Sequence, residues 1–402
     1  MKNNMIKRIV FIVVGGLGER DYKRYGIEIL QNYKFKVEVW DLTNILYPDT
    51  PKENKDSKGC KYSEIRVFKD KKEVTCNLLS LTSRDFVINM LTYDPWSLMI
   101  YRILSKSIAG YAVCCANSVP VPEEIKNFNH MARRLFDMVS HGSYFILLKQ
   151  IYLRFSKYYK KLIKPAAIAL TGGKNSSIRQ YVINDKTELI RIHTFDYDLY
   201  LDEIKLPYKD KYVAVFLDSM FTMDPEMSMH NIKQRINSKE YFYLLNSFFD
   251  YIEKELNIEV IIAAHPRSFY DSLPDCFNGR KCIKGQTIKL IRESYLVMAH
   301  YSTAVNFANL FYKPIIFMSS TKMQNTRDGY FIKEMAKWHG KNPVEIDRLE
   351  NINLKQEIYV NREAYKHYKE SYIKDENTIN EPFWEVVAKR LKTDFQSKEK
   401  YE

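Results

Sequence analysis

A histidine and an arginine that could bind a phosphate follow an apolar run in the second half of the chain. His265, Pro266 and Arg267 come directly after residues 258–263, which predict a buried strand. In an open α/β sheet, ligands bind beyond the carboxyl ends of the strands. An imidazole N–H and a guanidinium both suit phosphate oxygens, the guanidinium through a bidentate fork. The structural alternative is a histidine that ends its strand through a backbone contact.

A second polar turn follows in the same half. Residues 295–299 predict a strand and 303–311 a helix, and His300, Ser302 and Thr303 stand where the two meet. Hydroxyl groups at a helix start form an anion site together with unpaired backbone N–H groups and the positive helix end. A plain helix cap would use the same residues. Two polar turns at neighbouring strand ends suggest one shared anionic ligand.

These two turns resemble motifs of a known group of enzymes. The pair His265-Pro266 resembles the HP motif of bacterial sialyltransferases and related glycosyltransferases. Residues 301–304 (YSTA) and 309–317 (NLFYKPIIF) resemble their serine/threonine motif and the strand that follows it. The similarity extends over residues 212–320.

The resemblance implies a bacterial GT-B glycosyltransferase of surface-polysaccharide synthesis. Its donor would be a CMP-activated nonulosonic acid (sialic, pseudaminic or legionaminic type) or Kdo, and its acceptor a glycan or lipid-linked glycan. In such enzymes the HP histidine and the serine/threonine pair hold the donor phosphate. The resemblance therefore assigns donor binding to His265, Pro266, Arg267, His300, Ser302 and Thr303. Polyol-phosphate transferases that use CDP-glycerol share the motif pair and are the alternative.

The general base that deprotonates the acceptor hydroxyl stays open. The acidic-acidic-glycine motif that supplies it in several sialyltransferases is not evident here. Loops after the first-half strands offer the carboxylates Glu19, Asp21, Asp41 and Asp94. Asp94 is the first choice, because Pro95 and Trp96 fix the turn behind it and the indole could stack on a sugar. Asp41 is the second choice, and a helix cap is the alternative role for Asp94.

A glycine cluster after the first predicted strand keeps another enzyme class open. Gly15, Gly16 and Gly18 stand where a dinucleotide-binding turn would, and Asp41 follows at about the spacing of its ribose-binding acid. The glycine spacing departs from GxGxxG, so a tight strand-to-helix turn is the plainer interpretation. An NAD-dependent or epimerase-type enzyme and a non-catalytic nucleotide- or sugar-binding protein stay as alternatives.

The elements that must position these residues alternate along the whole chain. Short apolar runs typical of helix-covered parallel sheets predict strands at 8–14, 36–41, 86–91, 111–116, 166–170, 189–193, 212–217, 258–263, 295–299 and 314–318. Helical patterns lie at 22–31, 95–108, within 123–161, and at 240–256, 286–292, 303–311, 323–338, 362–372 and 382–391.

Two such series predict an α/β protein with two domains, and the resemblance implies that they are arranged as in GT-B enzymes. It would have two doubly wound, Rossmann-like domains facing a cleft, with C-terminal helices. The polar segment 202–211 is the expected boundary between an acceptor domain at 1–205 and a donor domain at 206–402.

Composition limits the remaining function classes. The net charge of +13 fits phosphorylated substrates, an anionic membrane or nucleic acid, but the signatures of nucleic-acid-binding domains are missing, so no nucleic-acid partner is expected. Six cysteines without a CxxC pair predict no disulfide framework or zinc site. No Asp-x-Asp pair follows a convincing strand end, so neither a metal nor a cofactor is expected beside the donor.

The expected location is cytoplasmic. No stretch approaches the roughly 18 uncharged apolar residues that a membrane span needs. Residues 144–164 combine apolar side chains with lysines. They predict either a helix lying at the inner membrane face or a core-packing helix with a basic outer side.

Overall fold

The computed structural model divides the chain into two compact units. It describes residues 5–48, 62–123, 160–221, 237–266, 268, 270 and 275–393. Unit 1 takes the described residues of Met1–Ala116, Phe145–Phe195 and Glu376–Glu402, and unit 2 those of Asn117–Tyr144 and Asp196–Asp375. The main change of unit therefore falls after Phe195, not between 205 and 206, and the last described segment returns to unit 1.

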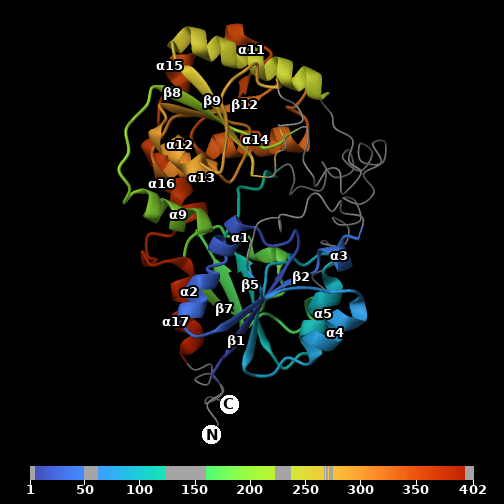
Figure 1. The fold of residues 1–402 in the computed structure, drawn as a ribbon. Coiled ribbons are helices and arrows are strands. Elements are labelled where there is room, and N and C mark those ends of the chain that lie inside the picture. The colour runs from blue at the N-terminus through green and yellow to red at the C-terminus, as the bar shows by residue number, and fades with distance from the viewer. Residues whose placement is uncertain are drawn as a thin grey trace. The chain divides into compact units, whose positions relative to one another are not determined.

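Unit 1 is built on a parallel sheet (Figure 1). Among the described residues, its seven strands run in the order β3-β2-β1-β4-β5-β6-β7. They are β1 (Arg8–Val13), β2 (Lys36–Asp41), β3 (Ile65–Val67), β4 (Asp85–Asn89), β5 (Gly110–Cys115), β6 (Ile168–Thr171) and β7 (Glu188–Arg191). Nearly every side chain of β1, β4 and β5 is buried, because helices cover both faces of a doubly wound sheet.

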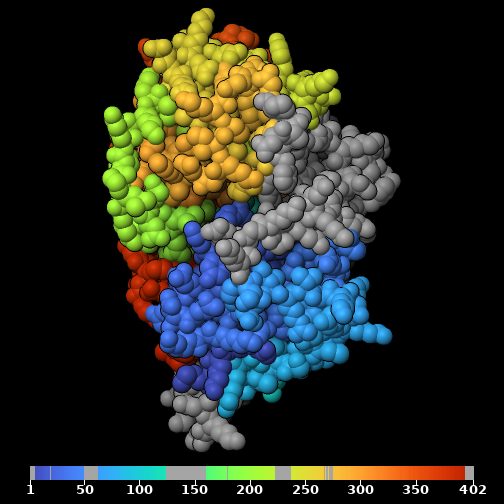
Figure 2. Space-filling view, in the orientation of Figure 1, coloured from blue at the N-terminus to red at the C-terminus, as the bar shows by residue number. Residues whose placement is uncertain are grey.

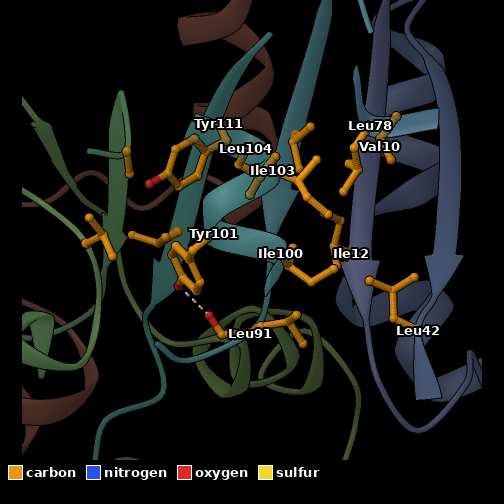
Figure 3. Close-up of a cluster of buried hydrophobic side chains, with 14 of the residues drawn as sticks. Val10, Ile12, Leu42, Leu78, Leu91, Ile100, Tyr101, Ile103, Leu104 and Tyr111 are labelled. Carbon is orange, nitrogen blue, oxygen red and sulfur yellow. Dashed lines mark hydrogen bonds between the residues drawn. The ribbon is translucent and has the colours of Figure 1, made fainter. Parts of the chain in front are cut away.

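Two helical layers cover this sheet. On one face, α4 (Lys71–Leu79) and α5 (Leu98–Lys106) pack into the apolar cluster of Figure 3. In that cluster the hydroxyl of Tyr101 donates to the carbonyl oxygen of Leu91, 2.7 Å away. The alternate side chains of β1 point to the other face, which α2 (Ile27–Asn32) and α17 (Phe383–Lys392) cover. The short helices α1 (Glu19–Arg24) and α3 (Thr43–Leu46) follow β1 and β2.

The C-terminal helix α17 packs in unit 1, although its residues were assigned to the second domain from the sequence. The buried indole of Trp384 donates through Nε1 to the carbonyl oxygen of Arg24, 2.7 Å away. Beside it, Gly26 has a φ of 54°, and a Cβ there would lie 2.3 Å from the indole. The helix predicted over 22–31 is therefore broken into α1 and α2. Figures 1 and 2 show the red C-terminal residues against the blue N-terminal part of this unit.

Unit 2 has a second parallel sheet. In the part of unit 2 that is described, six strands run in the order β10-β9-β8-β11-β12-β13. They are β8 (Val213–Leu217), β9 (Glu259–Ala264), β10 (Cys282–Lys284), β11 (Leu296–Ala299), β12 (Ile315–Ser319) and β13 (Val344–Glu345). Every side chain of β11 and β12 is buried.

Helices again cover both faces. α11 (Ser238–Leu256) packs five large apolar side chains, Tyr241, Leu245, Phe248, Phe249 and Ile252, on one face of the sheet. α12 (Thr287–Glu293), α13 (Val305–Leu310), α14 (Arg327–Trp338) and α16 (Arg362–Tyr368) pack on the other. A π-helical turn, Lys369–Ile373, continues α16. Two further helices are α9 (Phe195–Glu203) and α15 (Leu354–Glu357).

The two sheets share one topology. In each, the strand order reverses beside its first strand, between β1 and β4 and between β8 and β11. The prediction of two doubly wound parallel sheets is confirmed. Three short strands, β3, β10 and β13, were not predicted. Within the described ranges, no helix is long and apolar enough to cross a membrane, and no group of three acidic, histidine or cysteine residues could hold a metal ion.

Candidate functional site

Polar residues from four loops meet the carboxyl edge of the unit 2 sheet. Parallel strands end on one edge, and ligands of open α/β sheets bind where the strand order reverses. The last residues of β8 and β11, Leu217 and Ala299, pair with each other, and they pair with Ala263 of β9 and Phe317 of β12, which lie one and two residues before the ends of those strands. The residues that follow these four strand ends are therefore neighbours.

His265 follows β9 at this edge, as the sequence predicted, and is half-buried. Its backbone is fixed on both sides. Its N–H donates to Oδ2 of Asp218 at 3.0 Å, and its carbonyl oxygen accepts from both N and Oγ of Ser268. Lys284, at the end of β10, donates to the carbonyl oxygen of Ser268 and brings a positive charge to this turn. Pro266 is half-buried beside it, and Arg267 lies outside the described residues.

Asp218 is a site residue that the sequence interpretation missed. It directly follows β8 and is only 6% exposed. Its Oδ1 accepts from the N–H of Met220 at 2.8 Å, while Oδ2 accepts from His265. Met220 has a left-handed backbone, with a φ of 52°, which is unusual for a side chain of its size. The only signal in the sequence was an acidic residue directly after an apolar run.

Ser302 and Thr303 lie in the turn between β11 and α13, ahead of the helix. The helix begins at Val305, with Ala304 in the cap position. Oγ of Ser302 accepts from the N–H of Ala304 at 3.2 Å, while Thr303 is exposed. The pair is thus placed at the carboxyl edge, and its contact with a donor phosphate stays a prediction.

His300 does not fit the donor-binding role expected for it. The residue is completely buried. Its Nδ1 lies 2.7 Å from the carbonyl oxygen of Met318 and must carry the proton, because a carbonyl only accepts. Nε2 then accepts from the hydroxyl of Tyr241 at 3.0 Å. Burial lowers the pKa of His300 to about 4. Both ring nitrogens are engaged, so this histidine holds β11 to β12 and α11.

Two buried hydroxyl groups flank the same edge. Oγ of Ser219, after β8, and Oγ of Ser320, after β12, have no hydrogen-bond partner among the described residues. Buried polar atoms nearly always have a partner.

Asp94 in unit 1 has the geometry of the helix-cap alternative. Its side chain is 3% exposed. Oδ1 accepts from the N–H groups of Trp96 and Ser97, both at 3.0 Å, just ahead of α5. Oδ2 lies 3.3 Å from the hydroxyl of Thr92. A carboxylate that satisfies the first N–H groups of a helix is a structural residue, which argues against Asp94 as the base.

Asp41, the second choice, is also tied into the protein. It is the last residue of β2 and is 6% exposed. Its Oδ1 accepts from the N–H of Thr43 at 2.9 Å and from the Thr43 hydroxyl. That hydroxyl accepts in turn from the N–H of Gly15 at 2.7 Å. Asp41 thereby anchors the turn of Gly15 and Gly16, whose φ values of 93° and 82° favour glycine.

Asp21 is no freer than these two carboxylates. Asp21 is buried and pairs with Arg20 at 3.0 Å, and the side chain of Glu19 lies outside the described set. The structure therefore brings the predicted donor residues His265, Ser302 and Thr303 to one edge of unit 2, while the predicted bases Asp94 and Asp41 serve as structural anchors of unit 1.

Comparison with known proteins identifies the fold. No protein-family model and no curated protein sequence matches the chain. The solved structure of the wall teichoic acid polymerase TagF matches over 96% of this chain and 89% of that one, with a TM-score of 0.51 and 13% identity. A histidine-to-asparagine variant of TagF soaked with CDPG matches over 97% and 89%, again with a TM-score of 0.51 and 13% identity. The MnaA–UDP structure from S. aureus reaches a TM-score of 0.49 at 10% identity over 95% of both chains.

The likeness to TagF shows a shared fold. The chain has the GT-B fold, with two Rossmann-like α/β domains on parallel sheets and additional C-terminal helices. The predicted fold class is confirmed.

Proposed function

We propose that this chain is a glycosyltransferase that binds a nucleotide-activated donor at the carboxyl edge of the unit 2 sheet. The observation that carries the proposal is the cluster of donor groups at the β8–β11 reversal. His265, Ser302 and Thr303 come from neighbouring loops there. The buried hydroxyls of Ser219 and Ser320, which have no hydrogen-bond partner in the described part of the chain, follow β8 and β12. In open α/β sheets this is the place where ligands bind.

The chemistry of these groups suits a leaving phosphate. When the acceptor oxygen attacks the anomeric carbon of the donor sugar, the bond from that carbon to the phosphate oxygen breaks. The nucleotide then leaves with the electron pair. An imidazole N–H, hydroxyl groups and backbone N–H groups stabilise that negative charge when they are fixed in advance. The acceptor proton passes to a base. Asp94 and Asp41 are the candidates that the sequence offered for this base, and their buried hydrogen bonds argue against both.

The donor we propose is CMP-activated, with a nonulosonic acid or Kdo as the transferred sugar and a surface glycan as acceptor. Support comes from the HP pair His265-Pro266 at the end of β9 and from the serine/threonine turn after β11. Contact with an anionic membrane belongs to the same proposal, but of residues 144–164 only 160–164 are described. The proposed location is cytoplasmic, with peripheral contact at the inner membrane face, and no cofactor, metal or nucleic-acid partner is proposed.

A CDP-polyol phosphotransferase is the second candidate, and the likeness to TagF favours it. That polymerase was soaked with CDPG. In this reaction the acceptor oxygen attacks the phosphorus that carries the polyol, and CMP leaves as before. Both candidates therefore release CMP and differ in whether the transferred group keeps a phosphate.

A ligand panel followed by product analysis tests the proposal. The purified protein is heated with CMP, CDP, UDP, GDP and NAD in turn, and its unfolding temperature is measured. Stabilisation by CMP or CDP alone supports the proposal, and the mass of the product formed from a CMP-sugar or CDP-glycerol separates the two candidates. Stabilisation by NAD alone would contradict the proposal and favour an NAD-dependent enzyme. Cytidine binding without any turnover would leave a binding protein.

A further inference from the structure

Asp218 is a buried carboxylate that the proposed chemistry does not use. It follows the last residue of β8, the strand beside the reversal of the unit 2 sheet. With 6% of its surface exposed, it sits beneath the site, where an unpaired charge would be expensive. Its surroundings must therefore supply hydrogen bonds to both oxygens.

The two carboxylate oxygens hold two separate loops. Oδ1 accepts from the N–H of Met220 at 2.8 Å, in its own loop. Oδ2 accepts from the N–H of His265 at 3.0 Å, 47 residues further along the chain. The hydroxyl of Tyr270 also donates to this carboxylate, which together with burial raises the pKa of Tyr270. One side chain thus ties the end of β8 to the turn that carries the proposed phosphate ligand.

The strained backbone at Met220, within residues 218–221 just after β8, is stabilised by its hydrogen bond to the Asp218 side chain. Met220 holds a left-handed backbone, φ 52°, with its side chain buried, a conformation that costs about 1–2 kcal/mol without compensation. The bond from Oδ1 supports that turn. Next along the chain, Phe221 stacks on Tyr241, with ring centroids 5.5 Å apart, and packs on His300 at 5.3 Å. Residues 218–221 are therefore held between the Asp218 carboxylate and the His300–Tyr241 pair.

We propose that Asp218 is a positioning residue: by accepting the backbone N–H of His265, it sets the imidazole of His265 against the phosphate of a cytidine nucleotide. This inference rests on the proposed function. Asp218 acts through His265 and does not touch the donor. The role requires an acceptor at both oxygens, which only a carboxylate supplies. In Asp218→Asn, the amide NH₂ would face one of the two N–H donors.

A double-mutant cycle on nucleotide affinity tests the proposal. The dissociation constant of CMP is measured by calorimetry for wild type, Asp218→Asn, His265→Ala and the double variant. We expect Asp218→Asn to weaken CMP binding about tenfold, the scale of one charge-assisted hydrogen bond. If Asp218 acts through His265, the double variant binds CMP no more than about twofold more weakly than His265→Ala, because contacting sites are not additive.

The matched control is Asp85→Asn in unit 1. Asp85 is also 6% exposed and accepts a loop N–H, that of Thr82 at 2.7 Å. Its substitution should lower the unfolding temperature and leave the CMP affinity unchanged within about twofold. If Asp218 had only a structural role, Asp218→Asn would likewise lower the unfolding temperature and leave the CMP affinity unchanged.

Each remaining outcome decides the question. Fully additive effects in the cycle, or an Asp218→Asn variant with wild-type affinity, overturn the positioning role while the proposed function stands. Absence of CMP and CDP binding in the wild type overturns the proposed function itself, and the inference with it.

If Asp218→Asn does not fold, hydrogen exchange of the backbone amides of the wild type serves as the test instead. CMP must then slow exchange at 218–221 and at His265 together, and slowing at His265 alone contradicts the proposal.

Discussion

At the scale of the residue, the side chains proposed from the sequence separate into ligand candidates and anchors. His265, Ser302 and Thr303 lie at the carboxyl edge of the unit 2 sheet, while the polar side-chain atoms of His300 and Asp94 form hydrogen bonds within the protein. The sequence could place each of them after a predicted strand, because apolar runs mark strand ends. It could not show which polar partners His300 finds, since Met318 and Tyr241 lie 18 and 59 residues away in the chain. Asp94 finds its partners within three residues, where the sequence allowed both a cap and a base.

Replacing His265 by alanine should damage donor binding and turnover together. The imidazole is expected to stabilise the leaving phosphate, and loss of such a donor lowers turnover by about 10²-fold or more. CMP affinity by calorimetry and CMP release from the donor are the measurements. A folded His265→Ala variant with wild-type kinetics would refute the assignment.

Asp94→Asn separates the cap from the base. Asparagine accepts backbone N–H groups at a helix start about as well as aspartate, so stability should be kept. Turnover should stay within a few-fold, because Oδ1 of Asp94 holds the N–H groups of Trp96 and Ser97 just ahead of α5. Asp94→Ala should cost about 1 kcal/mol of unfolding free energy. Loss of turnover in a stable Asp94→Asn variant would instead identify Asp94 as the base.

The buried histidines predict a loss of stability in mild acid. Burial lowers the pKa of His300 and of His339 to about 4 each, against about 6.5 in an unfolded chain. Between these values the unfolded state binds more protons, so the unfolding free energy falls as the pH drops from about 6.5 towards 4. In His300→Asn, the loss measured by urea unfolding between pH 7 and pH 5 should be about 2 kcal/mol smaller than in wild type. An unchanged loss would mean that His300 is not a neutral buried residue.

At the scale of the element, periodicity was sufficient for the long and buried strands. β2 begins and ends where the sequence placed it, β8 and β11 begin one residue later, and β12 is shifted by one residue at both ends. The strands β3, β10 and β13 have two or three residues each, too few for a periodic pattern. The break between α1 and α2 was also missed, because it depends on the indole of Trp384, which packs there from the far end of the chain.

Gly26→Ala should lower the free energy of unfolding more than the same substitution at Gly279, a left-handed glycine with open space around its Cβ position. A Cβ on Gly26 would lie 2.3 Å from the ring of Trp384, whereas Gly279, with a φ of 72°, has nothing within 4 Å of its Cβ position. Gly279→Ala should cost about 1 kcal/mol through backbone strain alone. Gly26→Ala should cost well over about 2 kcal/mol, because overpacking is added. Calorimetric unfolding compares each variant with wild type, and equal losses would show that α17 does not constrain this position.

At the scale of the whole molecule, two successive βα series predicted two doubly wound domains, and the resemblance of the HP and serine/threonine motifs added the GT-B class. The likeness to TagF confirms that class at 13% identity. The domain limits were less predictable, because α17 returns to unit 1 through tertiary packing of Phe383 and Trp384. The alternating pattern along the chain carries no signal for such a return.

The structure of a CMP complex tests the central claim most directly. The account predicts that the phosphate of CMP lies within hydrogen-bonding distance of the His265 imidazole and of N–H or hydroxyl groups at Ser302 and Thr303, at the carboxyl edge of the unit 2 sheet. A nucleotide bound instead at the Gly15–Gly18 turn of unit 1, with that edge of unit 2 empty, would contradict it and favour the dinucleotide enzyme.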